Sequence, residues 1–309
     1  MASPSPPAPV GVRVRVPAKI NLALKVGAPR SDGFHPLATV YQALSLYDEV
    51  HAAWGHPDEF EVRVTGEGAD LVPLDDTNLA VRAARLLAQS YGPYDSLGVI
   101  LDIKKTIPVA GGLAGGSANG AAALVACAML WDLDVAPENM RALAAELGSD
   151  VPFALLGGTA VGSGRGEEVA PALARGTYHW VLGFAHHGLS TPAVYRRFDE
   201  LHPGAAPPLI PAELMNALRS GDPRQLGRTL DNDLQEPALQ LQPRLRLVLE
   251  AGLEYGALGA VVSGSGPTCA FLVDSESAAV DLSIALSADG LCRAVRRASG
   301  PVPGARVVP

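Results

Sequence analysis

A glycine-rich segment near the middle of the chain, Gly111-Gly-Leu-Ala-Gly-Gly-Ser117, restricts the possible folds more than any other stretch. The alternating apolar run from Leu97 to Ile103 before it predicts a strand. The alanine-rich run from Ala121 to Leu130 after it predicts a helix, because alanine has the highest helix propensity. We therefore expect a strand, a glycine loop and a helix in succession. The loop glycines can adopt positive φ and bring backbone N–H groups close to a ligand.

Ser117 stands where this helix is expected to begin, and the free N–H groups of a first helical turn favour a phosphate. The pattern G-x-x-x-x-G-K-[ST] requires a lysine where this chain has Ser117, and the dinucleotide pattern G-x-G-x-x-G does not fit. Without a loop lysine, backbone N–H groups, the helix dipole and metal ions would neutralise most of the phosphate charge. A glycine turn that merely packs a helix on a sheet is an equal alternative from these residues alone.

Extended to Asn119, the loop resembles the ATP loop of the GHMP kinases, which include galactokinase and the homoserine, mevalonate and phosphomevalonate kinases. Two further motifs of that family stand in the expected order. Pro17-Ala-Lys-Ile-Asn-Leu22 lies near the start, and Ser263-Gly-Ser-Gly-Pro-Thr268 lies near the end. The resemblance extends from about Val12 to the last predicted strand.

This resemblance implies an α+β, two-domain GHMP kinase fold. Its N-terminal domain would be like domain 2 of ribosomal protein S5, and its C-terminal domain would be ferredoxin-like. We expect the N-terminal domain, with the ATP loop, at residues 11–172 and the C-terminal domain at 173–309. Residues 1–10 are rich in serine, proline and alanine, which predicts a disordered tail and not a signal peptide.

Lys19 and Asp150 are the catalytic residues that the resemblance implies. By residue type alone, Lys19 would be a solvated strand lysine and Asp150 the N-cap of a short helix. In the family arrangement, Asp150 accepts the proton of the substrate hydroxyl as general base. Lys19 keeps Asp150 ionised and stabilises the negative charge that develops.

The resemblance also implies ATP and Mg²⁺ as cofactors. Asn78 is expected near the adenine, a role compatible with capping the following helix. Mg²⁺ would bridge the phosphates, with the Ser117 hydroxyl as a candidate contact, and no full set of metal ligands is assigned. Ala118 replaces a serine that is common in this loop. The loop residues expected to bind ATP are Pro108, Val109, Ala110, Gly111, Gly112, Leu113, Ala114, Gly115, Gly116, Ser117 and Ala118.

The turn Asp32-Gly-Phe-His35 narrows the resemblance to family members whose alcohol substrate contains a cytidylyl group. Phe34, where tyrosine is usual, is expected to stack on cytosine, and His35 to hydrogen-bond the same base. Asn21 and Thr191 complete the expected substrate-binding residues. A loop aromatic packed against the core remains the alternative.

Two further loops are interpreted structurally. Gly162-Ser-Gly-Arg-Gly166 predicts a tight turn between strands in which Arg165 is solvated. Thr191-Pro192 predicts a helix start, with Thr191 as the N-cap and Pro192 at the first helical position.

The expected reaction is transfer of the γ-phosphoryl group of ATP to the 2-hydroxyl of 4-diphosphocytidyl-2-C-methyl-D-erythritol. This step belongs to the non-mevalonate synthesis of isoprenoid precursors. The alternatives are a GHMP-family kinase for another small molecule and a non-catalytic ligand-binding protein of the same fold. The first would not need the Asp32–His35 turn, and the second would be free to lose Lys19 or Asp150.

Composition limits the partners of the chain. A net charge of -8 argues against a nucleic-acid surface. No apolar run approaches the roughly 20 residues that span a bilayer, which predicts a cytoplasmic protein without membrane contact. We expect a monomer or a weak homodimer that acts on a small molecule. The odd cysteine count and apolar surroundings predict reduced core thiols at Cys127, Cys269 and Cys292.

Overall fold

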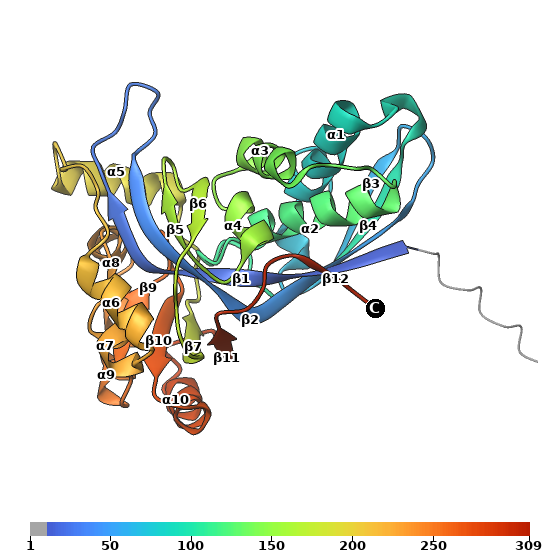
Figure 1. The fold of residues 1–309 in the computed structure, drawn as a ribbon. Coiled ribbons are helices and arrows are strands. Elements are labelled where there is room, and N and C mark those ends of the chain that lie inside the picture. The colour runs from blue at the N-terminus through green and yellow to red at the C-terminus, as the bar shows by residue number, and fades with distance from the viewer. Residues whose placement is uncertain (1–10) are drawn as a thin grey trace, which may run out of the picture.

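Two β-sheets form the protein in the computed structural model, which describes residues 11–309. The predicted tail at residues 1–10 lies outside the described residues. The larger sheet has eight strands and the smaller has four. Figure 1 shows that two long strands, β1 (Gly11–Val26) and β2 (Leu37–Trp54), extend through the whole first sheet. The predicted α+β class is confirmed by this arrangement.

The first sheet is organised around the antiparallel pair of β1 and β2. Its main path runs in the order β12-β1-β2-β4-β3, while β5 pairs with β2 and β6, and β8 pairs with β1. The other strands of this sheet are β3 (Phe60–Gly66), β4 (Val99–Lys105), β5 (Thr159–Ser163), β6 (Glu168–Pro171), β8 (Asp231–Asn232) and β12 (Arg306–Val308).

Helices α1 to α4 lie above one face of the first sheet (Figure 1). Their bounds are Leu79–Tyr91 for α1, Gly115–Leu130 for α2, Pro137–Leu147 for α3 and Val151–Leu156 for α4, with 3₁₀ turns at Ala69–Leu71 and Tyr94–Ser96. Small side chains let α2 sit between β1, β2 and α1. Gly120 faces the start of α1, where a Cβ would make ordinary contact with Leu79, 3.4 Å from its carbonyl oxygen.

The second sheet is antiparallel and has the order β11-β7-β10-β9. Its strands are β7 (Tyr178–Phe184), β9 (Gly259–Val262), β10 (Cys269–Val273) and β11 (Ala294–Gly300). Side chains alternate between two cores, as expected for strands covered on both faces. Trp180 and Leu272 join the core of the first sheet, whereas Val181 and Phe271 pack with residues of the helices.

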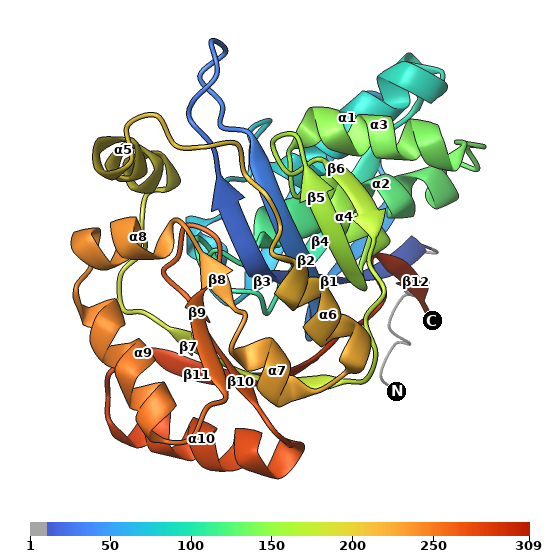
Figure 2. The same cartoon turned by 60° about the vertical axis from the view of Figure 1, so that its left-hand side comes forward.

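The helices of the C-terminal half are α5 (Thr191–Leu201), α6 (Ala212–Ser220), α7 (Pro223–Gly227), α8 (Gln235–Leu241), α9 (Arg244–Glu254) and α10 (Glu276–Ala288). Helices α7 to α10 pack against this second sheet, whereas α5 lies away from it and beside α8 (Figure 2). The described helices include none that is both long and apolar enough to cross a membrane.

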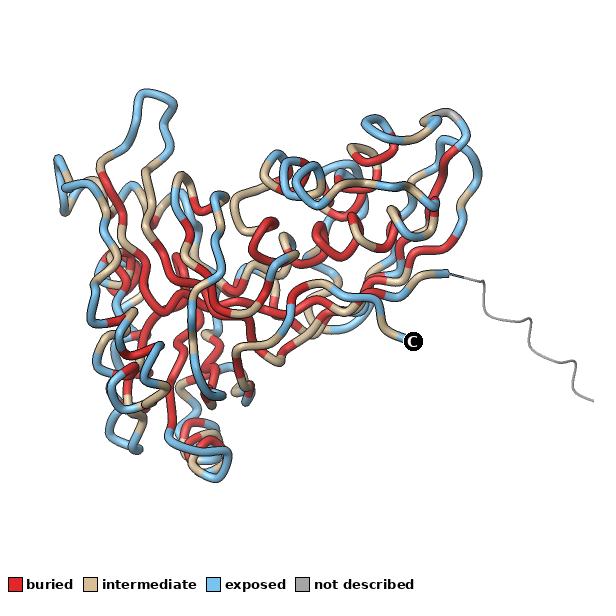
Figure 3. Tube along the Cα trace, viewed as in Figure 1, coloured by how far each residue is buried: buried red, intermediate tan, exposed pale blue. Residues whose placement is uncertain are grey.

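The two sheets share a continuous buried core, which Figure 3 shows in red along β1 and β2. The Trp180 indole N–H donates to Gln42 Oε1 at 2.9 Å, joining β7 to β2. The last strand, β12, returns to β1, where Arg306 pairs with Arg15. The end of the chain therefore belongs to the first sheet, although it lies within the range predicted for the C-terminal domain. The domain boundary between residues 172 and 173 stays a prediction.

Two local expectations need correction, both at the start of a helix. Helix α2 begins at Gly115, two residues before Ser117, with Ala114 as its N-cap. Helix α5 begins at Thr191, and its N-cap is Ser190, not Thr191. Strand β1 continues through Pro17, where a shift in register with β2 accommodates the proline. The three cysteines are free and buried, as predicted.

Candidate active site

A cleft of about 870 Å³ opens where β1, the β1–β2 loop, the glycine loop and the start of α5 meet. Most of the site residues predicted from the sequence line it. They are Lys19, Asn21, Phe34, His35, Asn78, Pro108, Val109, Ala110, Gly111, Gly112, Ala114, Gly115, Gly116, Asp150 and Thr191. Leu113 and Ala118 are instead buried in the core beneath the loop. Ser117 lies in the first turn of α2.

Lys19 and Asp150 face each other in this cleft. The Lys19 ammonium lies 3.7 Å from Asp150 Oδ2, and it donates a hydrogen bond to Asn21 Oδ1 at 2.8 Å. Lys19 is only 7% exposed, whereas the Asp150 side chain is 30% exposed. Asp150 stands at the N-cap of α4, but within residues 11–309 its side chain makes no capping hydrogen bond. Its carboxylate is therefore free to face Lys19 and the cleft.

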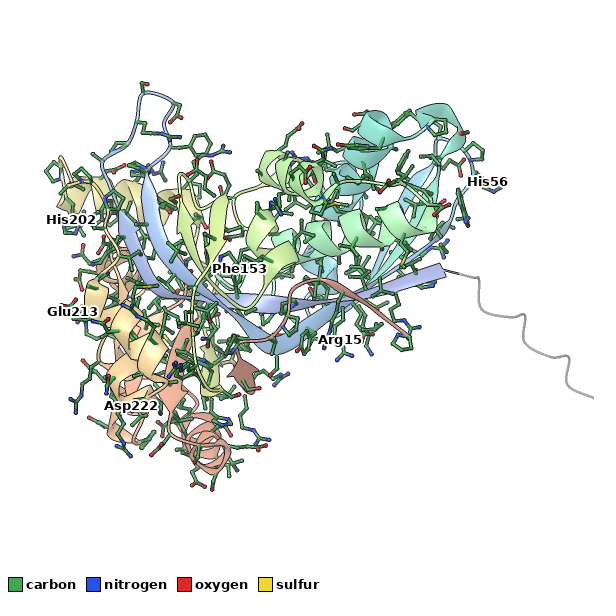
Figure 4. All side chains as sticks on the ribbon, in the orientation of Figure 1. Arg15, His56, Phe153, His202, Glu213 and Asp222 are labelled. Carbon is green, nitrogen blue, oxygen red and sulfur yellow. The ribbon has the colours of Figure 1, made fainter. Side chains whose placement is uncertain are left out.

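Two tyrosines that the sequence did not single out, Tyr41 and Tyr195, also line the cleft. Burial, followed by the negative charge of Asp150, raises the pKa of each phenol well above its usual value. Tyr41 is fixed by stacking on Phe153, labelled in Figure 4, with ring centroids 4.8 Å apart. The Lys19 ammonium lies 5.6 Å from the centre of the Tyr41 ring. Asp150 is thus accompanied by neutral phenols and by a cation.

The glycine loop has a different conformation from the one expected. Of its four glycines, only Gly112 has positive φ, at 74°. Ala110 and Ala114 also have positive φ, at 54° and 57°, which is unusual for residues with a Cβ. Gly115 and Gly116 belong to the first turn of α2, because the helix begins earlier than predicted. Strained backbone of this kind is often found at ligand sites.

The glycine loop is hydrogen-bonded on one side to β1 and on the other side to the turn that begins at Ser263. The Lys19 backbone N–H donates to the Leu113 carbonyl at 3.2 Å, and the Ser263 hydroxyl donates to the Gly112 carbonyl at 3.0 Å. A Cβ at Gly112 would collide with the Ser263 carbonyl oxygen. The loop is therefore enclosed between β1 and the second glycine turn, Ser263–Gly266, so the three motifs meet in one place.

A buried ionic cluster lies beneath the loop, where a Cβ at Gly115 would come within 3.1 Å of the Lys105 ammonium nitrogen. Asp48 is fully buried and accepts hydrogen bonds from the Lys105 ammonium, from Asn119 Nδ2 at 2.9 Å, and from the backbone N–H groups of Thr106 and Ile107 at 2.7 and 2.8 Å. Lys105 also donates to Asn119 Oδ1 at 2.9 Å. Lys105 and Asn119 belong to the wall of the cleft, but the Lys105 ammonium is engaged by Asp48 and Asn119 and its side chain is only 2% exposed.

The turn after β1 places an aromatic ring at the opposite end of the cleft. Phe34 is 50% exposed, and the Arg165 guanidinium lies 5.0 Å from the centre of its ring. Arg165, expected to be solvated, has a side chain that is 33% exposed, and it also lines the cleft with its guanidinium over the Phe34 ring. The glycines around Arg165 predicted a turn and nothing more. The contact with Phe34 joins residues far apart in the sequence, and a local sequence pattern does not reveal such a contact.

His35, beside Phe34, is held by α5. Its Nε2 lies 2.8 Å from Asp199 Oδ1, and its ring centre lies 4.9 Å from that of Tyr195. Figure 2 shows the β1–β2 loop and α5 on the same side of the molecule. Since a carboxylate accepts, Nε2 is the donor, and a neutral His35 then keeps Nδ1 as an acceptor.

Asn78 and Thr191 also lie where they were expected to line the cleft. Asn78 Oδ1 accepts from the Ala80 N–H at 2.9 Å, which confirms its capping role in α1. Its Nδ2 donates to the Pro73 carbonyl at 2.8 Å. The Thr191 hydroxyl pairs with that of Ser265 at 2.8 Å and so connects α5 to the second glycine turn. The part of the chain that the structure describes has no group of three or more histidine, cysteine or acidic residues able to hold a metal ion.

Comparisons with known proteins agree with this geometry. Residues 78–158 match the GHMP kinases N terminal domain, and residues 214–290 match the GHMP kinases C terminal family. The 4-diphosphocytidyl-2-C-methyl-D-erythritol kinase of Mycolicibacterium smegmatis is 55% identical over 302 residues, 96% of this chain and 92% of that protein. The enzyme of the same name from Nocardia farcinica is 54% identical over 302 residues, 97% of both chains.

Solved structures show the same fold. A crystal structure of 4-(cytidine 5'-diphospho)-2C-methyl-D-erythritol kinase has a TM-score of 0.75 and 32% identity, covering 93% of this chain and 98% of that one. The L. major mevalonate kinase in complex with R-mevalonate has a TM-score of 0.70 and 16% identity, covering 96% of this chain and 98% of that one. The second similarity concerns the fold alone.

The ionic cluster under the loop leads to a stability prediction. Lys105→Met leaves the buried Asp48 carboxylate without its cation, and we expect a loss of about 3–5 kcal/mol in the free energy of unfolding. Adding Asp48→Asn removes the unpaired charge and should restore most of that loss. Urea unfolding of the two variants measures both values. A single variant as stable as the unmodified protein would show that the pair is not a buried ion pair in solution.

The loop conformation predicts that Gly112 matters for stability and Gly116 for ATP binding. Gly112→Ala should lower the free energy of unfolding by about 1–3 kcal/mol, because Gly112 has positive φ and packs on the Ser263 carbonyl. Gly116→Val is the matched change, since a Cβ there meets only Leu79 Cδ1, at 3.7 Å. This variant should keep its melting temperature and lose ATP affinity by at least about tenfold, or 1.4 kcal/mol. Calorimetric titration showing unchanged ATP affinity would place the phosphates elsewhere.

Proposed function

The chain belongs to the GHMP kinase family, and we propose that it transfers the γ-phosphoryl group of ATP to the 2-hydroxyl of 4-diphosphocytidyl-2-C-methyl-D-erythritol. The reaction belongs to the non-mevalonate synthesis of isoprenoid precursors. Relatives with this enzyme name are 53–55% identical over nearly the whole chain. The observation that carries the proposal is the Lys19–Asp150 pair at 3.7 Å, between the glycine loop and the Phe34 turn.

ATP would lie with its phosphates against the glycine loop. The backbone N–H groups from Gly111 to Gly116 and the positive end of α2 provide donors and partial charge for an anion. The adenine would lie near Asn78, where the neighbouring residues Leu71 to Pro73 also line the cleft. This arrangement leaves the γ-phosphate end of ATP close to Lys19, because the Lys19 backbone N–H is bonded to the loop at Leu113.

Asp150 would act as the general base. As the 2-hydroxyl oxygen attacks the γ-phosphorus, its proton passes to the Asp150 carboxylate, the bond to the β-phosphate oxygen breaks, and ADP leaves. The Lys19 ammonium stabilises the carboxylate before the transfer and the charge on the phosphoryl oxygens during it. The neutral Tyr41 and Tyr195 phenols limit the water around Asp150, which favours the alcohol as phosphoryl acceptor.

Mg²⁺ would be held mainly by ATP. The ion in phosphoryl-transfer enzymes keeps several waters and takes one or two protein oxygens in addition to phosphate oxygens. Of the candidate oxygens, the Asp150 carboxylate lines the cleft, whereas Ser117 lies in the first turn of α2 and is not among the residues that line it. The Asp150 side of the cleft fits a magnesium ion that arrives with the nucleotide. When bound, the ion would neutralise charge on the phosphates.

Cytosine would bind at the Phe34 end of the cleft. The exposed Phe34 ring offers a stacking surface, and the half-buried His35, in its neutral form with Nε2 donating to Asp199, offers Nδ1 as an acceptor. The exocyclic amino group of cytosine is a donor, whereas uracil has a carbonyl oxygen at that position. This acceptor would therefore favour cytosine. Thr191 and Tyr195 come from α5 and would border the same part of the substrate. The cytoplasmic location and the monomeric or weakly dimeric state stay predictions.

If Asp150 is the general base, replacing one of its carboxylate oxygens should slow the reaction. Asp150→Asn keeps the shape of the side chain and removes the proton acceptor, so turnover should fall by roughly 10²–10⁴. Calorimetry should show little change in ATP affinity. The exposed Asp134 provides the control, since Asp134→Asn should leave turnover unchanged. Turnover close to normal in the Asp150 variant would remove Asp150 from the chemistry.

The substrate assignment rests on Phe34. Phe34→Ala should weaken binding of the cytidylyl substrate by about 1–3 kcal/mol, the usual contribution of base stacking. Phe34→Tyr is the matched control and should be nearly neutral, because the ring remains. The ATP affinity of both variants should be unchanged.

A second comparison decides between this kinase and another of its family. The rate on the cytidylyl substrate should greatly exceed the rate on methylerythritol phosphate, which lacks the cytidylyl group. Equal kcat/KM on the two alcohols would mean that the turn containing Phe34 does not recognise the cytosine base. The enzyme would then be a GHMP-family kinase for a different small molecule.

A further inference from the structure

The position of the Lys19 ammonium is set by Asn21 rather than by Asp150. At 3.7 Å, the distance from Lys19 Nζ to Asp150 Oδ2 is too long for a hydrogen bond, whereas Asn21 Oδ1 accepts from Lys19 at 2.8 Å. Asn21 is 2% exposed, so its amide has little access to solvent. What orients this amide therefore determines where the ammonium lies.

A threonine on β2 orients the Asn21 amide. Asn21 Nδ2 donates to Thr39 Oγ1 at 2.8 Å, and Thr39 Oγ1 donates to the Ala23 carbonyl at 2.7 Å. A hydroxyl has one proton, and Thr39 gives it to Ala23. Toward Asn21 it can then only accept, so the NH₂ group of Asn21 must face Thr39. The Asn21 carbonyl oxygen is thereby left to face Lys19, and the opposite orientation would place two donors against each other.

The pairing of β1 with β2 supports this arrangement. Register shifts occur between Pro17 and Ala18 and between Asn21 and Ala23, one on each side of the segment that holds Lys19. Such irregularities redirect side chains and are frequent beside active sites. After the second shift Thr39 pairs with Leu24, which brings its hydroxyl to the Ala23 carbonyl.

We propose that Thr39 is a positioning residue of the kinase. Through Asn21 it holds the Lys19 ammonium beside Asp150, and its effect on the reaction passes through these two side chains. Thr39 is fully buried, and among the described residues it is not one that lines the cleft. In this arrangement the Asn21 amide oxygen accepts a hydrogen bond from Lys19. This role differs from the substrate contact expected from the sequence. The kinetic part of this inference rests on the proposed function.

Thr39→Val tests the inference because it keeps the volume and removes the hydroxyl. The kcat on the cytidylyl substrate should fall about tenfold, which corresponds to the loss of one buried hydrogen bond of about 1.4 kcal/mol. The KM values for ATP and for the alcohol should stay within about twofold of normal, because Thr39 touches neither ligand. Thr39→Ser keeps the hydroxyl and should restore most of kcat.

Thr159 provides a matched control on the neighbouring strand β5. It is also buried, and its hydroxyl accepts from Gln42 Nε2 at 3.3 Å instead of joining the Lys19 chain. Thr159→Val should lower stability about as much as Thr39→Val and leave kcat unchanged. Equal losses of kcat in the two variants would mean that Thr39 acts only through the stability of the sheet.

A double-mutant cycle tests the path through Asn21. In an Asn21→Ala background, Thr39→Val should produce no further loss of kcat, because the group that it orients is gone. A full tenfold loss in that background would overturn the proposal.

A crystal structure of the Thr39→Val variant gives a readout that does not depend on the substrate. The distance from Lys19 Nζ to the Asn21 amide oxygen should lengthen from 2.8 Å to more than about 3.5 Å. An unchanged distance would contradict the inference whatever the enzyme phosphorylates. Failure of the unmodified protein to use the cytidylyl substrate would instead contradict the proposed function.

Discussion

Burial of the Lys19 ammonium is the constraint on which the site depends. A cation that is 7% exposed needs compensating partners, because its removal from water is costly. Those partners come from separate segments, namely Asn21 on β1 and Asp150 before α4. The backbone N–H of the same residue bonds to the glycine loop at Leu113. A single residue therefore connects the proposed base to the phosphate loop, and a change in any of these segments would move the others.

The charge distribution of the cleft explains how an acidic protein can bind two anionic ligands. The chain has a net charge of -8, so its overall field does not attract a nucleotide. In the proposed complex, local groups would serve instead, namely the loop amides, the start of α2 and the Lys19 ammonium. The Lys105–Asp48 pair adds no net charge to the cleft, because both side chains are buried and neutralise each other.

Sequence motifs predicted the parts of this site that are local in the chain. Lys19, the glycine loop, Asp150 and the second glycine turn were recognised because each stands within a short pattern, and the structure brings them together. Contacts between distant residues left no such pattern. Two examples are the contact of Arg165 with Phe34 and the ion pair of Lys105 with Asp48. Each joins segments far apart in the chain, so sequence periodicity does not predict it.

The conformation of the loop was also beyond the sequence patterns. Glycine permits positive φ without requiring it, and here Ala110 and Ala114 adopt it while Gly115 and Gly116 are helical. Their conformation follows from the early start of α2 and from the contacts of Gly112 with the second glycine turn. Similarly, Asn21 was predicted as a substrate contact, and its bonds to Lys19 and Thr39 depend on the register of β1 with β2.

The most direct test of this account is a crystal structure with the cytidylyl alcohol and a non-hydrolysable ATP analogue bound together. The substrate 2-hydroxyl oxygen should lie within about 3.2 Å of an Asp150 carboxylate oxygen. The γ-phosphate analogue should lie on the other side of that hydroxyl, between the glycine loop and the Lys19 ammonium. A complex in which the 2-hydroxyl points away from Asp150, with another side chain within hydrogen-bond distance of it, would contradict the account.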